Sequence, residues 1–342
     1  MNTAMTEGKT VRAIVIDQPG PPETLQIGQI KYPELQPDSL LVDVHAAGVN
    51  FADILERDGT YPVSFPFVPG REGVGVVRET GTAVSEFTVG DRVAWTTVGA
   101  SYAEQVIVPE AAAVAVPGAL TDEQALSLAQ GLTAHYLATS AYPAAVGDSV
   151  LVHAAAGGVG SLLTQILAIR GVRVLATVST LQKAEIARAA GAADVLVLGE
   201  MADADLIQEV RRLTDGRGVS AVYDGVGQAT FQASLGCLCR RGYLVLFGGS
   251  SGAVTAVDPA QLLSAGSVFL TRPGLADYIA TREELVRRAA ELYGWIAADQ
   301  LSVHIGGRYP LAEAGRAHAE LASRRSTGKL VLLTAHAHSG PD

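Results

Sequence analysis

The chain has 342 residues, of which 48% are hydrophobic, and a formal net charge of −10 at pH 7. A chain of this length can bury a large core and is expected to divide into two domains. The negative charge argues against nucleic acid and anionic membrane as partners, because both repel an acidic surface. The start of the sequence is polar and no apolar run reaches the length of a membrane helix, so we expect a cytoplasmic protein.

The first part of the chain reads as short β-rich runs separated by proline and glycine, which predicts an antiparallel, partly barrel-like unit. The predicted strands are residues 11–16, 39–46, 73–79 and 92–96.

From Gln130 onward strands and helices alternate, which predicts a parallel sheet covered by helices. The predicted strands are residues 150–153, 172–177, 195–198, 219–224 and 243–247, and the predicted helices begin at Gly160 or span 181–190 and 203–214. Cys237 and Cys239 stand one residue apart in a predicted strand, and two cysteines so placed form no disulfide framework. We therefore expect a reducing compartment.

The last part of the chain is expected to pack back on the first domain. It contains a predicted helix at 282–298, the segments 301–305 and 310–324, and a predicted strand at 329–333. The expected domains are residues 1–129, completed by 302–342, and residues 130–301.

Residues 149–161 join an apolar strand to a glycine-rich turn that opens a helix. In the register G-x-G-x-x-G the turn covers 155–160, with Ala155 in the first glycine position. Such a turn in a βαβ unit brings backbone amides at a helix N-terminus close to a pyrophosphate. The sequence therefore predicts a dinucleotide site, with a purely structural glycine-rich turn as the alternative.

The end of the second predicted strand indicates which dinucleotide binds. NAD sites carry a carboxylate there for the ribose 2′-hydroxyl. This chain has Thr177, Val178, Ser179 and Thr180, followed by Lys183. A hydroxyl and an ammonium suit a 2′-phosphate, so the prediction is NADPH, although Lys183 taken alone is also compatible with a solvated surface lysine.

Several ordered motifs carry a resemblance to a known family. They are GVNFAD at 48–53, PGRE at 69–72, VGDRV at 89–93, QGLTA at 130–134, HAAAGGVG at 153–160, YDGVG at 223–227, FGGSSG at 247–252 and Thr-Arg-Pro at 271–273. With these motifs the chain resembles the zinc-free branch of the medium-chain dehydrogenase/reductase superfamily, specifically the NADPH:quinone oxidoreductases related to zeta-crystallins. The resemblance implies a doubly wound Rossmann domain, a β-rich GroES-like catalytic domain and a homodimer.

The zinc-dependent members of that superfamily hold catalytic zinc with a cysteine and a histidine in two of these motifs. Here those positions hold Asn50 and Arg71, and neither can serve as that ligand. We therefore expect no metal. We interpret Glu72 as a structural or salt-bridging residue, with a catalytic role as the alternative.

The resemblance also assigns site residues, in a cleft expected between the two domains. Asn50, Asp53 and Tyr61 are the catalytic candidates; a loop-stabilising amide, a helix cap and a residue covering the cleft are the respective alternatives. The residues assigned to the cofactor are Thr133, Gly157, Gly158, Val159, Gly160, Ser179, Lys183, Phe247, Ser250, Ser251 and Arg324.

Three further positions qualify this assignment. Relatives carry a tyrosine against the adenine phosphate region where this chain has Leu198, which predicts less strict NADPH selectivity. Lys329 is interpreted as a surface charge. His153 is interpreted as a buried, hydrogen-bonded histidine rather than a catalytic base.

The function that these features favour is reduction of a quinone by hydride from NADPH without zinc. Quinones accept hydride readily and need a hydrogen-bond donor to the oxygen that becomes negative. A first alternative is an NADPH-dependent enone or enoyl reductase on the same fold. A second is a nucleotide-binding structural or RNA-binding protein of the crystallin type, against which the acidic composition argues.

Overall fold

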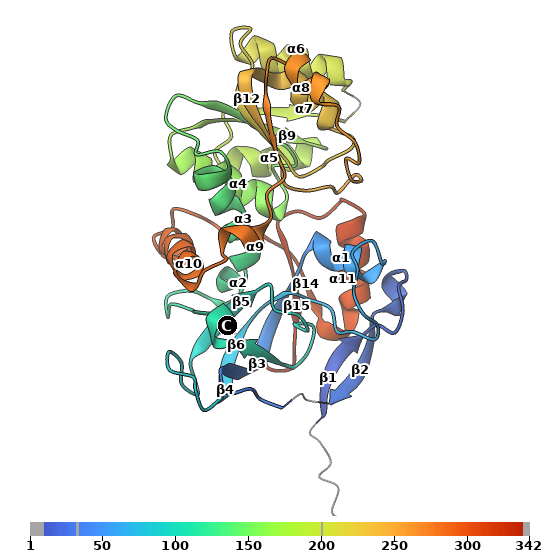
Figure 1. The fold of residues 1–342 in the computed structure, drawn as a ribbon, viewed down its shortest axis with the longest axis vertical. Coiled ribbons are helices and arrows are strands. Elements are labelled where there is room, and N and C mark those ends of the chain that lie inside the picture. Colours follow the sequence, from blue (N-terminus) through green and yellow to red (C-terminus); the bar gives the residue numbers. More distant parts are fainter. Residues whose placement is uncertain (1–9, 32–33, 200, 338–342) are drawn as a thin grey trace, which may run out of the picture. The chain divides into compact units, whose positions relative to one another are not determined.

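The computed structural model describes residues 10–31, 34–199 and 201–337. The chain forms two compact units (Figure 1). Unit 1 comprises Met1–Ala129 and Ile305–Asp342, and unit 2 comprises Gln130–His304.

Unit 2 is built on a parallel six-stranded sheet in the order β10-β9-β8-β11-β12-β13. The strands are β8 (Ser149–Val152), β9 (Arg173–Val178), β10 (Asp194–Val197), β11 (Val219–Asp224), β12 (Leu238–Leu246) and β13 (Phe269–Thr271). The helices between and after them are α4 (Gly158–Ile169), α5 (Leu181–Ala189), α6 (Asp203–Leu213), α7 (Phe231–Cys237), α8 (Pro259–Ser264), α9 (Leu275–Tyr278) and α10 (Arg282–Ala297). Ahead of β8 lies α3 (Leu128–Tyr136).

The order of these strands reverses next to β8. The chain moves outward from β8 through β9 to β10, and then returns to β11 on the other side of β8. Right-handed crossovers in opposite directions place their helices on opposite faces of the sheet. Accordingly α4 packs with α5 and α6 packs with α7 (Figure 1). Such a reversal is where ligands bind, at the carboxyl ends of the strands.

The sheet of unit 2 is apolar because helices cover it on both sides. Leu151, Leu175, Val222 and Leu244 come from four adjacent strands and are fully buried in one core cluster. This rigid core fixes the strand ends that carry the glycine-rich turn.

Unit 1 is β-rich and mostly antiparallel, and its main sheet has the order β14-β15-β3-β4-β5-β7, with β6 paired to β3. Its strands are β1 (Thr10–Val15), β2 (Gln26–Lys31), β3 (Ser39–Val49), β4 (Glu72–Thr80), β5 (Arg92–Thr96), β6 (Gln105–Pro109), β7 (Ala113–Ala115), β14 (Ile305–Pro310) and β15 (Lys329–Leu333). Its helices are α1 (Phe51–Arg57), α2 (Asp122–Ala125) and α11 (Ala314–Ala322).

The C-terminal segment completes the sheet of unit 1. Strand β15 pairs antiparallel with β3, with Leu330 opposite Val49 and Leu333 opposite Ala46 (Figure 1). Strand β3 in turn pairs with β4 on its other side. The central strand β3 therefore lies between a strand from early and a strand from late in the sequence.

The expected α/β fold class is confirmed: a parallel Rossmann-type sheet in one unit and a β-rich GroES-like unit in the other. One local prediction is wrong. Cys237 is the last residue of helix α7, and the strand begins only at Leu238, so the two cysteines do not share a strand. Both are free thiols. No helix within the described residues is long and apolar enough to cross a membrane.

Candidate active site

The glycine-rich turn lies between β8 and α4, where the strand order reverses. Gly157 is the N-cap of α4 and makes no side-chain cap hydrogen bond. A Cβ atom on Gly160 would lie 2.4 Å from the carbonyl oxygen of Ala154, and one on Gly158 would lie 2.2 Å from Oε1 of Gln130. Helix geometry leaves the first amides of α4 without intrahelical acceptors. The turn therefore fits a pyrophosphate, which these amides would bind.

The carboxyl end of β9 presents hydroxyl groups and one ammonium. Ser179 is exposed, and Lys183 is half-buried in the first turn of α5. Thr180 is the N-cap of that helix, and its Oγ1 accepts a hydrogen bond from the Lys183 amide at 3.3 Å. Partial burial lowers the pKa of the Lys183 ammonium. These groups fit a 2′-phosphate. Leu198, which stands where the resemblance places a tyrosine against the adenine phosphate region, packs against the core of unit 2.

The loop after β12 carries three predicted cofactor residues and is held against the loop after β11. The amide of Phe247 donates to the carbonyl of Asp224 at 2.9 Å, and the amide of Ser251 donates to that of Val226 at 2.8 Å. The Ser251 hydroxyl donates to the same Val226 carbonyl at 2.7 Å and accepts a backbone amide of the neighbouring loop at 2.9 Å. Ser251 therefore shapes this loop, and Ser250 lies half-buried beside it.

The two remaining predicted cofactor residues belong to different units. Thr133 is half-buried on α3 in unit 2. Arg324 is exposed in unit 1, just after α11, in a left-handed backbone conformation with φ of 58°. A role for either at the cofactor stays a prediction.

His153, directly after β8, is buried and hydrogen-bonded. Its Nδ1 lies 2.8 Å from Oγ1 of Thr177, and its Nε2 lies 3.0 Å from Oγ of Ser234. Burial lowers the pKa of this imidazole. Both ring nitrogens are thus used to tie β8 to β9 and α7, which confirms the interpretation of His153 as a structural histidine.

In unit 1, Asn50 stands between the end of β3 and the start of α1. Its backbone amide donates to Oδ2 of Asp53 at 2.8 Å, which is half of a capping box. Its side chain is half-buried, and its Nδ2 donates to Oε2 of Glu72 at 3.0 Å. Glu72 therefore holds the side-chain amide in place.

Asp53 is completely buried and ends a directed chain of hydrogen bonds. The hydroxyl of Tyr102 donates to its Oδ2 at 3.1 Å and lies 3.0 Å from Nε2 of His318. Nη1 of Arg57 lies 3.4 Å from Nδ1 of His318. Because Arg57 has only donors to offer, Nδ1 accepts and Nε2 carries the hydrogen, which it donates to Tyr102.

The electrostatics of this chain follow from its burial. Oδ1 of Asp53 has no hydrogen-bond partner, and burial raises the pKa of this carboxyl to about 7. Burial, assisted by the neighbouring Arg57, lowers the pKa of His318 to about 3. His318 is therefore neutral at physiological pH, and Asp53 is the member of this chain that titrates there. Sequence patterns give no signal for Tyr102 or His318.

Lys329 is buried, and its interpretation as a surface charge is wrong. Its side chain is 1% exposed and forms an ion pair with Glu72, whose side chain is fully buried. Nζ of Lys329 also donates to Oδ1 of Asn50 at 3.2 Å. The salt-bridging interpretation of Glu72 is confirmed. The signal that sequence analysis missed is Gly48, a glycine inside a strand, which often marks a close approach.

Tyr61 and Arg71 lie nearer the surface of unit 1. Tyr61 is 41% exposed, and its amide donates to the carbonyl of Leu55 at 2.7 Å. Arg71 pairs with the buried Glu56. By the resemblance of the motifs, Arg71 and Asn50 stand where zinc-dependent relatives place zinc ligands, and they offer no thiolate, imidazole or carboxylate. Within the described residues no group of three or more His, Cys, Asp and Glu side chains is arranged to hold a metal.

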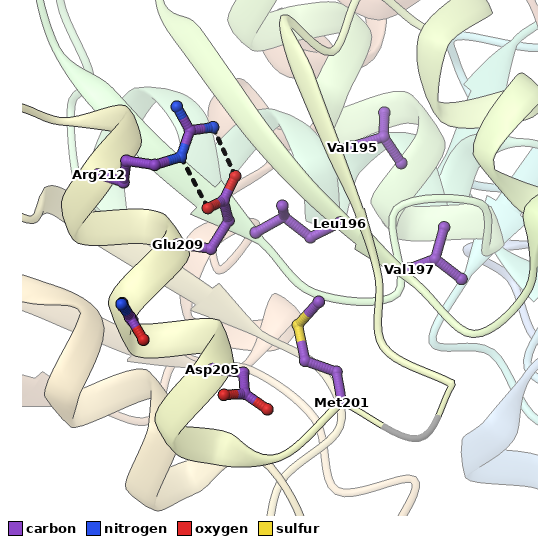
Figure 2. Close-up of a pocket in the computed structure, with 8 residues that line it drawn as sticks. Val195, Leu196, Val197, Met201, Asp205, Glu209 and Arg212 are labelled. Atoms are coloured by element: carbon purple, nitrogen blue, oxygen red, sulfur yellow. Dashed lines mark hydrogen bonds and ion pairs between the residues drawn. The ribbon is translucent and has the colours of Figure 1, made fainter.

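A surface pocket of about 480 Å³ lies between β10 and α6 (Figure 2). Leu196 and Met201 contribute apolar lining, while Arg212 and Glu209 form a two-pronged ion pair at distances of 2.8 and 2.6 Å. None of the predicted cofactor residues lines it.

Each of the two units contains a region that matches a known protein family. Residues 36–118 match the family model of the alcohol dehydrogenase GroES-like domain, and residues 158–291 match that of zinc-binding dehydrogenases. The chain is 41% identical to the quinone oxidoreductase of Pseudomonas aeruginosa over 318 residues, covering 92% of this chain and 97% of that protein. The chain belongs to the quinone oxidoreductase family of the medium-chain dehydrogenase/reductase superfamily.

Other proteins are also similar to this chain over nearly their whole length. The 2-haloacrylate reductase of a Burkholderia species is 35% identical, with 94% of this chain and 99% of that protein covered. The Escherichia coli quinone oxidoreductase complexed with NADPH has a TM-score of 0.91 at 37% identity, covering 95% of this chain and all of that one. The mycobacterial protein Rv1454c, also complexed with NADPH, has a TM-score of 0.91 at 46% identity, with 94% and 99% covered. The family resemblance read from the motifs is thereby confirmed.

Proposed function

We propose that this chain is an NADPH-dependent quinone oxidoreductase. Two features of the chain carry the proposal together. Unit 2 has a pyrophosphate turn with no carboxylate at the end of β9, and unit 1 has Asn50 and Arg71 in the positions where zinc-dependent relatives place ligands. Relatives that are up to 41% identical are quinone oxidoreductases, and two similar structures hold NADPH.

The residues that would hold the cofactor divide along its length. The amides of Gly158, Val159 and Gly160 would bind the pyrophosphate, and Ser179 and Lys183 would bind the adenosine 2′-phosphate. When bound, NADPH supplies the hydride for reduction of the acceptor. The residues on the loop after β12, and Thr133 on α3, would line the nicotinamide half.

The task of unit 1 in this proposal is to stabilise the acceptor oxygen that gains negative charge. The Asn50 side-chain amide, which Glu72 holds through a hydrogen bond of 3.0 Å, is proposed to donate to that oxygen. A donor already held in place stabilises the developing charge without reorganising. Asp53 holds the Asn50 backbone from within α1, and Tyr61 is proposed to shape the acceptor pocket.

NADPH oxidation, followed by its absorbance with a panel of quinones, enones and enoyl thioesters, tests this function. Turnover of quinones with NADPH at least tenfold faster than with enones supports the proposal. The 35% identity to a 2-haloacrylate reductase makes reduction of an activated carbon–carbon double bond the second candidate. Absence of turnover with every acceptor, despite tight NADPH binding, would favour a structural, crystallin-like role.

We propose that the chain forms a homodimer. We also propose that it is located in the cytoplasm. Strand β13 is an edge of the parallel sheet, and Phe269 on it is 50% exposed. Leu263, which precedes this strand, is 70% exposed. Unpaired edges with exposed apolar side chains favour pairing with a second chain. Light scattering on the wild type and on Phe269→Glu tests this, with a mass of two chains for the first and one for the second.

A further inference from the structure

A second cavity of unit 2 lies at the amino ends of three neighbouring strands, β11, β12 and β13. Its walls are the segments 216–217, 238–240 and 263–267, together with Arg211 of α6. The volume is about 810 Å³, and ligand cavities commonly have about 300–1,000 Å³. The glycine-rich turn lies at the carboxyl ends of the same sheet, and none of the predicted cofactor residues lines this cavity. The cavity is therefore separate from the dinucleotide site.

The charge of the cavity is opposite to that of the whole chain. Arg211, Arg217 and Arg240 line it, and no acidic side chain of the described residues does, whereas the chain has a formal net charge of −10. Arg217 has one ion pair, with Asp215 at 3.8 Å, and because these side chains are 78% and 90% exposed, solvent screens the pair. A local positive cluster of this kind attracts a small anion.

The walls of the cavity are held in place by hydrogen bonds to backbone groups. The guanidinium of Arg211 donates to four carbonyls of the segments 216–217 and 236–238, at distances of 2.9–3.2 Å. The amide of Arg241 donates to the carbonyl of Gly266 at 2.9 Å, which ties β12 to the loop before β13. Arg211 therefore shapes the wall and adds its charge, and the cavity is already formed without a ligand.

The other two arginines have donors to offer to a ligand. The guanidinium of Arg240 is exposed and has no hydrogen bond or ion pair with any other part of the chain that the structure describes. Besides its pair with Asp215, Arg217 makes one long hydrogen bond, from Nε to the carbonyl of Thr214 at 3.4 Å. Each guanidinium is a planar set of N–H donors that matches the oxygens of a carboxylate or a phosphate.

The number of arginines favours a phosphate over a carboxylate. A phosphate group carries almost two negative charges and three acceptor oxygens, so it can bind two guanidiniums at once. A carboxylate has one charge and two oxygens, which one guanidinium satisfies. The cavity also has apolar lining, because Leu263 is 70% exposed and Ala265 is half-buried beside it. This lining fits an organic group attached to the phosphate.

We propose that this cavity binds a small organic phosphate. Its phosphate group contacts Arg217 and Arg240, and its apolar part lies against Leu263 and Ala265. The site lies within unit 2 and does not rest on the proposed reductase function. Leu263 also belongs to the edge that we propose for the homodimer, so the bound molecule would lie beside that edge.

The cavity contains its own reporter group. Cys239 lines it and is half-buried, whereas Cys237 is buried, and the chain has no other cysteine. The uncharged reagent N-ethylmaleimide should therefore alkylate Cys239, and peptide mass spectrometry measures the rate. Phenyl phosphate at about ten times its Kd should slow this alkylation about tenfold, because the thiol reacts only while the cavity is empty. Excess NADPH keeps the glycine-rich turn occupied throughout. An unchanged rate overturns the proposal.

Isothermal titration calorimetry with phenyl phosphate, again with NADPH bound, tests the two arginines. The double variant Arg217→Gln/Arg240→Gln should weaken binding about tenfold or more, because it removes both donors and leaves the wall held by Arg211. The control Arg188→Gln/Arg287→Gln removes the same charge from exposed positions outside the cavity and should change the Kd less than about twofold. Equal weakening in both double variants, or none in either, overturns the site.

Two further probes test the chemical class of the ligand. Benzoate keeps the ring and replaces the phosphate by a carboxylate, and inorganic phosphate lacks the ring. Each should bind at least about tenfold more weakly than phenyl phosphate in the same titration. Benzoate binding as tightly as phenyl phosphate contradicts the choice of a phosphate, and inorganic phosphate binding as tightly contradicts the organic part.

Discussion

Replacing Asp53 by asparagine should make unit 1 more stable at neutral and alkaline pH. The carboxyl is completely buried, and its pKa rises from 3.8 to about 7 chiefly because burial disfavours the charged form. Because the pKa of Asp53 is higher in the folded than in the unfolded state, its contribution to the free energy of unfolding is fully present below the unfolded pKa. This contribution is lost as the pH rises through the folded-state pKa. At about 1.36 kcal/mol per pH unit, a shift of about 3 units corresponds to about 4 kcal/mol. An asparagine at this position would match protonated Asp53 in shape and would not ionise.

The expected observation is a difference in unfolding free energy, Asp53→Asn minus wild type, that is small near pH 4, grows up to about pH 7 and is constant above it. His318 changes the free energy of unfolding with pH in the opposite direction. Its folded-state pKa of about 3 means that its contribution to stability is lost as the pH falls. Both proteins share this effect, so it cancels in the difference.

Urea unfolding of the cofactor-free protein between pH 5 and pH 9 measures this difference. The chain has two tryptophans, and Trp95 is fully buried in unit 1. In a Trp295→Phe background Trp95 alone reports on that unit. Asp17→Asn, at an exposed position of the same unit, provides the control for replacing a carboxyl by an amide. A difference that is constant from pH 5 to pH 9, or an Asp53→Asn variant that is less stable at pH 8, would refute the reasoning.

Three further predictions concern the cofactor and metals. Lys183→Ala should weaken NADPH binding about 10- to 100-fold and leave NADH binding nearly unchanged, since a hydrogen bond to a charged group is worth about 1.5–3 kcal/mol. Fluorescence titration measures both affinities, and Arg188→Ala on the same helix is the control. Equal weakening of both cofactors would show that the 2′-phosphate does not bind at Lys183. Gly160→Ala should lower the Tm and abolish NADPH binding in the same titration, because its Cβ would lie 2.4 Å from the backbone oxygen of Ala154; a variant that binds normally would contradict the close-packed turn. Elemental analysis should find no stoichiometric metal, and activity should survive dialysis against a chelator. One zinc per chain, together with loss of activity on chelation, would contradict our interpretation that Asn50 and Arg71 bind no zinc.

Regular patterns made most of the architecture predictable. The predicted bounds 92–96, 219–224 and 329–333 are those of strands β5, β11 and β15, because each strand contains a buried apolar run that the sequence shows. The boundary near Cys237 was predicted wrongly because the surrounding residues are apolar and suit a helix end or a strand equally well. Periodicity alone does not separate those two states in a short apolar segment.

The site was predictable only where one local motif determines it. The pyrophosphate turn lies within 153–160, so its glycines were found from sequence. Lys329 is 281 positions from Gly48, and the sequence shows neither that their strands pair nor that a missing side chain leaves room for an ammonium. The Tyr102–His318 contact also joins distant segments, 216 positions apart. Such contacts depend on strand register, which a single sequence does not specify.

The division of unit 1 into two chain segments has a consequence for the order of synthesis. Residues 305–337 leave the ribosome after all of unit 2, so until then β3 lacks its neighbour β15, Glu72 lacks its ammonium and Tyr102 lacks His318. A nascent chain therefore holds a complete Rossmann unit beside an open sheet edge with an unpaired carboxylate. Unit 1 closes last, and its exposure to aggregation and to chaperones lasts as long as the ribosome takes to translate the 175 residues of unit 2.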